Sequence, residues 1–226
     1  MKQFLLFIAC YATLFTMTNC VFAQTKNQID ANGLRQGDWQ AHYANGQLRY
    51  EGQFTDGKEV GVFRHYYENG NLKVESDFVE PGVKSESKVY ADSGKLIAEG
   101  AYVNQQKDGE WRFYDEESGV LILTEVYYDG WRHGLSKSYF PNGNVQEITT
   151  FDMDNKEGLW QSFNEDGSPQ SSSFYSGNQF HGEGKFYYPN GVLREEGNFE
   201  NGRKVGIWRT YDDEGYLISE DLYDEE

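Results

Sequence analysis

Apolar and polar residues alternate through almost the whole chain, and glycine-containing pairs interrupt the alternation at regular intervals. Residues 185–206 show the pattern most clearly, because two alternating runs meet there at Asn190-Gly191. Side chains of a β-strand point to opposite faces in turn, and an Asn-Gly pair between two such runs is typical of a hairpin with a type I′ turn. We therefore predict a β-hairpin over this segment.

The same pattern returns at a fixed period along the chain. Successive units begin 24 residues apart, except for one step of 25, whose extra residue lies in the turn at residues 115–119. A fixed period of this length indicates a repeat architecture, not a set of independent globular domains. The residues at position zero of the units are Gly37, Gly61, Ser85, Gly109, Gly134, Gly158, Gly182 and Gly206.

A two-residue Asn-Gly loop sets the register of each hairpin, since partner positions must then sum to seventeen. Position two, often a large ring, faces a small residue at position fifteen, as Trp39 faces Gly52. Position zero faces an aromatic residue at position seventeen, and we expect its glycines to make room for these rings. Position six faces position eleven on the same side, as Tyr43 faces Leu48. One face of the sheet is therefore predicted to be apolar.

The other face is predicted to carry ion pairs. Position three is basic in six units and position fourteen is Glu in five, and the register places them opposite one another, as with Arg64 and Glu75. Closing the connections between units places each position fourteen opposite the next unit's position three as well. Opposite charges directly across a ladder contribute about 0.2–1 kcal/mol each. The sequence thus predicts an all-β fold, an elongated single-layer antiparallel meander of about eight stacked 24-residue hairpins.

The composition fits strands and narrows the range of partners. Aromatic residues make up 16% of the chain, and ring-bearing residues favour β-sheets. The 37 acidic against 20 basic residues give a net charge of −17. This charge repels the phosphates of nucleic acids and anionic lipid surfaces. We expect no nucleic-acid partner, and no stable membrane insertion of the processed chain.

The first 23 residues differ in kind from the rest. Lys2 precedes an uncharged apolar run at residues 4–15, and Val21-Phe22-Ala23 ends in the small residue that signal peptidase prefers. The run is short of the roughly 20 apolar residues that a membrane span needs. We therefore predict a signal peptide at 1–23, a lead-in at 24–36 and the repeat domain at 37–226. The product would be exported, to the periplasm, the cell surface or the medium.

The two cysteines both lie in this leader. Cys20 raises the alternative of a lipoprotein, but Met17-Thr18-Asn19 lacks the Leu and the small residue that usually precede an acylated cysteine. Because Cys10 lies in the leader too, a chain cleaved after Ala23 has neither a disulfide nor a thiol nucleophile.

The repeated residues, G-x-W-x-x-Y-x-x-x-G-x-L-x-x-E-x-x-F-x-x-G, resemble the MORN repeat, specifically the variant common in bacterial proteins. The resemblance covers about residues 30–226. It implies a twisted single-layer meander of stacked hairpins used for protein or lipid association, and some relatives are antitoxin-like. The chain departs from the pattern at Ser85 and Ser87, which follow Pro81, and at Pro169, where Leu is usual. Because proline cannot donate to a ladder, we expect these units to be bent or poorly paired.

Catalytic, cofactor-binding and metal-binding residues are not predicted. The four histidines show no ligand spacing, and residues 171–173 lack a Gly-x-Ser-x-Gly elbow. Residues 152–154 begin like a calcium loop, but Lys156 and Glu157 stand where a ligand and the turn glycine belong. We therefore expect a non-enzymatic protein with no cofactor and no metal.

One column of residues suggests a binding surface. Position five is aromatic in seven units although the register places it on the ion-paired face. Either these rings pack over neighbouring aliphatic stems and keep a solvated hydroxyl, or they form a recognition stripe for a peptide or a glycan, since Tyr offers flat apolar area with a polar tip. The candidate binding residues are Tyr66, Tyr90, Tyr114, Tyr139, Phe163, Tyr187 and Tyr211.

Together these patterns favour an exported, non-enzymatic repeat scaffold that binds or presents a partner protein. A surface glycan-binding module is one alternative. An antitoxin-like inhibitor protein is another, although the export signal argues against a cytoplasmic target.

Overall fold

The computed structural model describes residues 25–224, so the predicted signal peptide and Cys20 lie outside the described residues. This part of the chain forms β-strands and turns and contains no helix. No segment of it could therefore cross a membrane as an apolar helix. The strands are β1 (Gln28–Ile29), β2 (Arg35–His42), β3 (Leu48–Thr55), β4 (Lys58–Tyr66), β5 (Leu72–Glu80), β6 (Lys84–Tyr90), β7 (Leu96–Val103), β8 (Gln106–Tyr114), β9 (Leu121–Tyr128), β10 (Trp131–Tyr139), β11 (Val145–Asp152), β12 (Asn155–Phe163), β13 (Pro169–Ser176), β14 (Gln179–Phe180), β15 (Gly182–Tyr187), β16 (Leu193–Glu200), β17 (Arg203–Tyr211) and β18 (Leu217–Tyr223).

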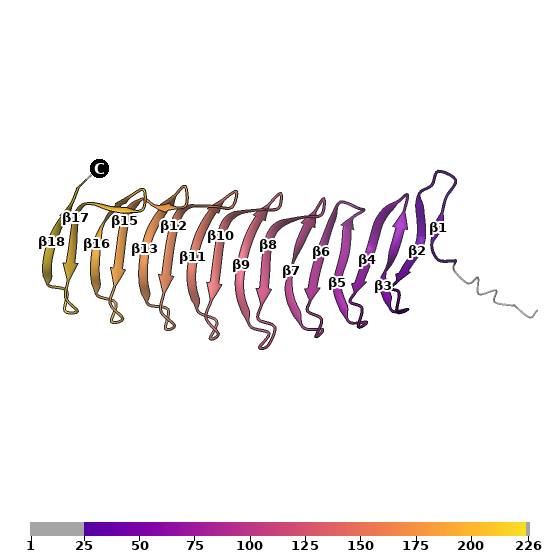
Figure 1. Cartoon of the computed structure of the whole chain (residues 1–226), viewed down its shortest axis with the longest axis horizontal. Coiled ribbons are helices and arrows are strands. Elements are labelled where there is room, and N and C mark those ends of the chain that lie inside the picture. Colours follow the sequence, from indigo (N-terminus) through magenta and orange to yellow (C-terminus); the bar gives the residue numbers. More distant parts are fainter. Residues whose placement is uncertain (1–24, 225–226) are drawn as a thin grey trace, which may run out of the picture.

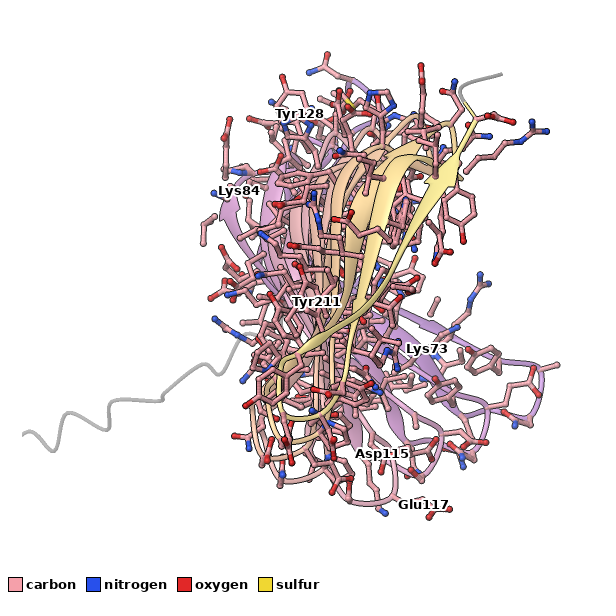
Figure 2. The ribbon with its side chains drawn as sticks, turned by 90° about the vertical axis from the view of Figure 1, so that its left-hand side faces the viewer. Lys73, Lys84, Asp115, Glu117, Tyr128 and Tyr211 are labelled. Carbon is pink, nitrogen blue, oxygen red and sulfur yellow. The ribbon has the colours of Figure 1, made fainter. Side chains whose placement is uncertain are left out.

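Except for β14, each strand pairs antiparallel with the next one along the chain, so the hairpins stand in one row from β1 to β18 (Figure 1). Strand β13 pairs with both β14 and β15, which a break at His181 separates. Viewed along the row, the N-terminal hairpins are turned relative to the C-terminal ones, as expected from the usual twist of strands (Figure 2). The predicted all-β meander is confirmed.

The predicted register is confirmed in the part of each hairpin that lies away from its turn. Gly37 pairs with Phe54 and Trp39 with Gly52. Arg64 pairs with Glu75 within its hairpin and with Glu51 of the preceding unit, so the charges interleave along the sheet as expected.

The hairpin turns differ from the prediction. At residues 43–47 the amide of Gly46 donates to the carbonyl of Tyr43 at 3.0 Å, and the amide of Tyr43 donates to the carbonyl of Gln47 at 2.8 Å. Gly46 has a positive φ of 85°, whereas Asn45 is not among the residues with positive φ. This is a three-residue loop, a type I turn followed by a left-handed glycine, so the predicted type I′ turn is wrong. Asn45 instead uses its side chain, which accepts from the amide of Gln47 at 2.9 Å.

The longer loop shifts the register next to the turn. His42 pairs with Leu48, and Ala41 pairs with Tyr50, so Arg49 is an extra residue in a bulge. A shift of one residue moves side chains to the opposite face. The predicted pairing of positions six and eleven is therefore wrong. Position eleven pairs with position five instead, on the ion-paired face.

Type I′ turns do occur, in the connections between hairpins. Asp56 and Gly57, with φ of 50° and 78°, lie between Thr55 and Lys58, which pair with one another. The connection after β5 is the exception, with three residues between Glu80 and Lys84. The other connections carry two consecutive positive-φ residues, at Asn104-Gln105, Asp129-Gly130, Met153-Asp154, Gly177-Asn178 and Asn201-Gly202.

The glycines at position zero do not make room for rings. Gly61 has a φ of 60°, and a Cβ built on it would meet nothing within 4 Å. Glycine is needed there because side-chain-bearing residues rarely adopt this conformation. Space is made at position fifteen instead, where a Cβ on Gly52 would overlap the Phe63 ring of the next unit.

The packed residues of the sheet lie on what we call the ring face, made by positions zero, two, four, thirteen, fifteen and seventeen. Three of the large position-two rings, those of Phe63, Trp111 and Trp208, lie over the position-fifteen glycine of the preceding unit. Trp208 is 1% exposed, its indole N–H donates to the carbonyl of Asn198 at 3.0 Å, and its ring meets Phe199 edge-on at 4.9 Å. Successive units therefore bury one another's rings in place of a closed core.

Hydrogen bonds at both ends of the strands also link each unit to the next. At the hairpin turns, the Asn45 side chain donates to the carbonyl of Glu68 at 3.0 Å. At the connections, the amide of Gly57 donates to the carbonyl of Arg35 at 3.0 Å. Figure 2 shows both ends of the strands, with Asp115 in a hairpin turn at one end and the connections at the other.

The units expected to be bent or poorly paired are both paired with their neighbouring strands, so the prediction of poor pairing is wrong. Strand β6 pairs with β5 continuously from Val89 to Ser85, and Ser85 is not among the positive-φ residues that bulge the other units. Pro169 pairs with Phe163 in the register of the other hairpins. As the first residue of β13 it is where a strand tolerates proline.

Candidate functional site

The position-five residues form a half-buried column on the ion-paired face, one per unit. Each pairs across the hairpin with an apolar residue at position eleven, as Tyr66 pairs with Leu72 and Tyr187 with Leu193. This bulged pairing explains why rings occur on a face that is otherwise charged. The structure places the seven rings in line but encloses no common pocket with them. Their role in binding stays a prediction.

Four hydroxyls of this column are bonded within the chain, and that of Tyr139 bonds to the hydroxyl of Thr124 at 3.2 Å. The other three share one kind of partner. Each donates to a glutamate at position fourteen of the preceding unit: Tyr66 to Glu51 at 2.8 Å, Tyr114 to Glu99 at 2.6 Å and Tyr211 to Glu196 at 2.8 Å.

These environments shift the tyrosine titrations. Burial, and then the hydrogen bond to the carboxylate, raise the pKa of Tyr66 and of Tyr114 to about 12. The neutral phenol is therefore the form that the fold favours, because the carboxylate accepts a hydrogen bond from it and opposes a second negative charge.

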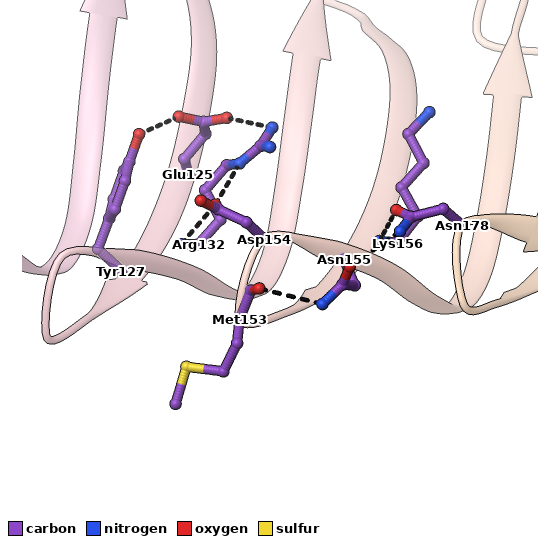
Figure 3. Close-up of polar contacts among 8 residues, drawn as sticks. All are labelled: Glu125, Tyr127, Arg132, Met153, Asp154, Asn155, Lys156 and Asn178. Carbon is purple, nitrogen blue, oxygen red and sulfur yellow. Dashed lines mark hydrogen bonds and ion pairs between the residues drawn. The ribbon is translucent and has the colours of Figure 1, made fainter.

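A polar cluster interrupts the ring face between β9 and β12 (Figure 3). Glu125 is only 8% exposed and accepts a hydrogen bond from the Tyr127 hydroxyl. Arg132 lies between two carboxylates, 3.7 Å from Glu125 and 2.8 Å from Asp154. Asp154 also accepts from the backbone amide of Arg132 at 3.0 Å, which fixes the connection turn against β10. Each charged side chain of the cluster therefore has a partner within the cluster.

The titrations within the cluster follow from these contacts. Burial, then the hydrogen bond to Glu125, raise the pKa of Tyr127. The hydrogen bond from Arg132 lowers the pKa of Asp154. Asp152 contacts a different partner, His133 at 3.1 Å, so these two aspartates do not converge on one point. No group of three His, Cys, Asp or Glu residues within 25–224 is arranged to hold a metal.

Cations over the ring face are a feature that sequence reasoning missed. Lys204 lies 4.0 Å from the ring centre of Trp208, and Lys107 lies 4.7 Å from that of Trp111. Such contacts are worth about 0.5–2 kcal/mol. The signal was present in the sequence as a basic residue two places before position zero, at Arg35, Lys107, Arg132, Lys156 and Lys204.

Three units lack a large ring at position two, and two of these gaps are filled from within the chain. At Gly184 the ring of Phe199 occupies the space, with Phe180 5.3 Å from it. At Ser136 the neighbouring strand supplies Glu125, which pairs with it across the ladder and carries the polar cluster. The third gap, at Ser87, is different, because the residue two places before position zero of its unit is Val83, which is neither a cation nor a ring.

Ser87 itself is 3% exposed, and the hollow of ≈ 630 Å³ that we call the groove lies beside it on the ring face, where Ser76 and Ser85 line it. Its floor contains serines, with Ser76 and Ser85 both bonded to the Ser87 hydroxyl, at 2.7 and 3.2 Å. The groove is lined by Arg35, Tyr50, Phe54, Glu59, Phe63, His65, Val74, Ser76, Phe78, Gly82, Val83, Ser85, Tyr102 and Gln105.

Several polar groups at the rim of the groove have no partner within residues 25–224. The Tyr102 hydroxyl, the His65 ring nitrogens and the Glu59 carboxylate make no hydrogen bond or ion pair there. Burial lowers the pKa of His65, so the neutral imidazole is favoured. Apolar walls with a few unengaged polar groups are typical of a binding site.

The fold and its contacts define a class: a β-repeat protein of stacked hairpins, in which each unit is completed by its neighbours. Five segments match the model of the MORN repeat variant family, at residues 35–56, 59–80, 132–153, 156–176 and 180–201. The chain is therefore a MORN-repeat protein, and the resemblance seen in its sequence is confirmed. The groove unit, with Ser85 and Ser87, lies between the matched segments.

Other comparisons add little. No curated protein matches the sequence. Among solved structures, "Crystal Structure of TcdB2-TccC3-Cdc42" is 12% identical over 81% of this chain, with a TM-score of 0.24. "Crystal Structure of TcdB2-TccC3-TEV" is 12% identical over 86% of this chain, with a TM-score of 0.21. This chain spans only 15% and 12% of those chains, and likeness at these scores carries no argument.

Proposed function

We propose that this chain is an exported, non-enzymatic repeat scaffold that binds a partner protein on its ring face. The groove at Ser87 is the observation that carries the proposal. It lies beside one of the three positions at which the series of packed rings lacks a position-two ring, and its walls include Phe63, Phe78 and Tyr102. Aromatic residues are enriched at protein interfaces because they supply large apolar area with polar tips.

The rest of the molecule supports a binding role more than a catalytic one. Glu125, Arg132 and Asp154 satisfy one another, and the position-five hydroxyls of Tyr66 and Tyr114 are bonded to glutamates. The polar side chains of these sites are therefore engaged in joining units. The export half of the proposal rests on the pattern of residues 1–23 alone.

Site-specific photo-crosslinking tests the proposal in cells that export the chain. A photoreactive residue at Gln105, exposed at the rim of the groove, is expected to give an adduct of one defined mass. The matched control is Glu86, which is exposed one strand away on the ion-paired face. No adduct from Gln105, or equal adducts from both sites, would contradict binding on the ring face. An adduct removed by glycosidase and not by protease would favour the glycan alternative.

A further inference from the structure

The gap at Ser87 lies where neighbouring units place a ring. Phe63 lies over Gly52 and meets Phe54 edge-on at 5.1 Å and 84°. Trp111 lies over Gly100 and meets Tyr102 edge-on at 4.9 Å and 72°. In both cases the ring rests on position fifteen of the preceding unit and against its position seventeen. A third ring placed in the same way would complete the series.

The surfaces for such a third ring are present at the gap. Ser76 and Phe78 are the position-fifteen and position-seventeen residues of the preceding unit, and both line the groove. Thr149 occupies position fifteen opposite Trp160 in another unit, so a small hydroxyl-bearing residue is compatible with a ring. A ring at the gap would therefore lie over Ser76 and against Phe78, as Phe63 and Trp111 lie over and against the corresponding residues. The groove's volume of ≈ 630 Å³ leaves room for a flanking side chain.

The charge at the rim indicates what flanks the ring. In five other units a cation two places before position zero covers a ring, as Lys107 covers Trp111. The equivalent residue at the gap is Val83, and the nearby Glu59 carboxylate has no ion pair within the described residues. A ligand that carried a cation beside its ring would supply the missing cover and a partner for Glu59.

We propose that the groove takes an aromatic side chain flanked by a basic residue, both from a partner protein. This inference rests on the proposed binding function and narrows its partner to a segment with the sequence character of Lys-Trp or Arg-Phe. The chain's own net charge of −17 favours such a basic segment over an acidic one.

The test uses acetyl-Lys-Trp-amide as the probe and the methyl resonances of Val74 and Val83, which line the groove, as reporters. Peptide at millimolar concentration is expected to shift both resonances, since two side chains bring only weak affinity. Ser87→Trp fills the gap from within and should weaken binding about tenfold or more. It should also raise the melting temperature, which shows that the variant is folded.

Lys88→Trp is the matched control, because it adds the same indole one residue along, on the ion-paired face. It should bind the peptide as the unchanged protein does. No shift at Val74 and Val83 in the unchanged protein, or full binding by Ser87→Trp, would overturn the inference.

Glu59→Gln tests the charged half of the proposal. The unchanged protein should prefer acetyl-Lys-Trp-amide over acetyl-Glu-Trp-amide, and the variant should lose about two- to fivefold of that preference. A preference that the variant keeps in full would contradict the role of Glu59. The crosslinking test separates this inference from the proposed function. If the Gln105 adduct persists in Ser87→Trp, the scaffold binds its partner on the ring face, but not through an inserted ring.

Discussion

Glycine meets two different needs in this sheet, and single substitutions separate them. Gly197 provides space, because an added Cβ would overlap the Trp208 ring. Gly206 provides conformation, because its φ is 65° and nothing lies within 4 Å of an added Cβ. A sequence shows both only as glycine.

Gly197→Asn is therefore expected to destabilise the protein more than Gly206→Asn. The first forces side-chain atoms into a packed ring, which costs about 1–3 kcal/mol or more. The second places asparagine, a residue that tolerates the left-handed region, in open space and should cost about 1 kcal/mol or less. Urea unfolding of both variants measures the difference. The reverse order would show that the two glycines have been assigned the wrong roles.

Ring burial distinguishes the two faces. Trp208→Ala removes a side chain that is 1% exposed and should cost about 3–5 kcal/mol. Tyr187→Ala, on the ion-paired face, removes a half-buried ring and should cost about 1 kcal/mol. Denaturant melts give both values. Equal costs would mean that position five belongs to the packed core, and the predicted binding stripe would then lose its basis.

Alkaline pH should weaken the fold between about pH 10 and pH 12. The unfolded chain loses tyrosine protons near pH 10, whereas Tyr66 and Tyr114 hold theirs until about pH 12 in the fold. The folded chain then binds more protons than the unfolded one, so stability falls as pH rises through this window. Urea midpoints across the window measure the slope. Tyr66→Phe with Tyr114→Phe should flatten it, and an unchanged slope would contradict the role of these two groups.

At the scale of the element, turn chemistry decides which connections are strained. Met153 has a φ of 45° in a type I′ turn, is 43% exposed, and its side chain points away from the sheet (Figure 3). The equivalent residue in the last connection is Asn201, with a φ of 50°. Methionine lacks the local side-chain hydrogen bonds that make this conformation acceptable to asparagine.

Met153→Asn is expected to stabilise the protein by about 1 kcal/mol, since it relieves this strain at no loss of packing. The exchange Asn201→Met, at the equivalent site, should destabilise by a similar amount. Thermal melts of the two variants provide the comparison. If Met153→Asn melts at or below the temperature of the unchanged protein, the turn is not strained as described.

The sequence predicted the strands and half of their register, for a physical reason. Period-two alternation and complementary charges such as Arg64 and Glu75 both identify the same pairing. The loop type was not predictable, because an Asn-Gly pair suits either a type I′ turn or a type I turn followed by a glycine bulge. The extra residue of the three-residue loop produces the bulge at Arg49. The bulge in turn makes position eleven the partner of position five.

The groove was only partly predictable. Ser87 in a column of large rings is visible in the sequence, as are Ser136 and Gly184. Which of these gaps is filled depends on side chains from other positions, since Phe199 and Glu125 come from outside the column. Those placements require the folded sheet.

At the scale of the whole molecule, stability should be distributed. Strands make extensive contacts only with their neighbours along the chain within residues 25–224. A fragment ending just before Gly158 is therefore expected to keep its β signal by circular dichroism and to bind acetyl-Lys-Trp-amide, because it retains the groove. Complete loss of the β signal would instead indicate one cooperative core.

The same arrangement determines how the protein would respond to force. The described chain begins and ends at opposite ends of the row, so tension between its ends pulls across the sheet, along the direction of the ladder hydrogen bonds (Figure 1). Such a load breaks the ladder hydrogen bonds of the outermost strand one after another, and it does not shear all the bonds of a strand at once. Each hairpin that peels away would release its 24 residues, roughly 80 Å of extended chain. A tethered scaffold of this kind would lengthen in even steps under low tension while its remaining units stay folded.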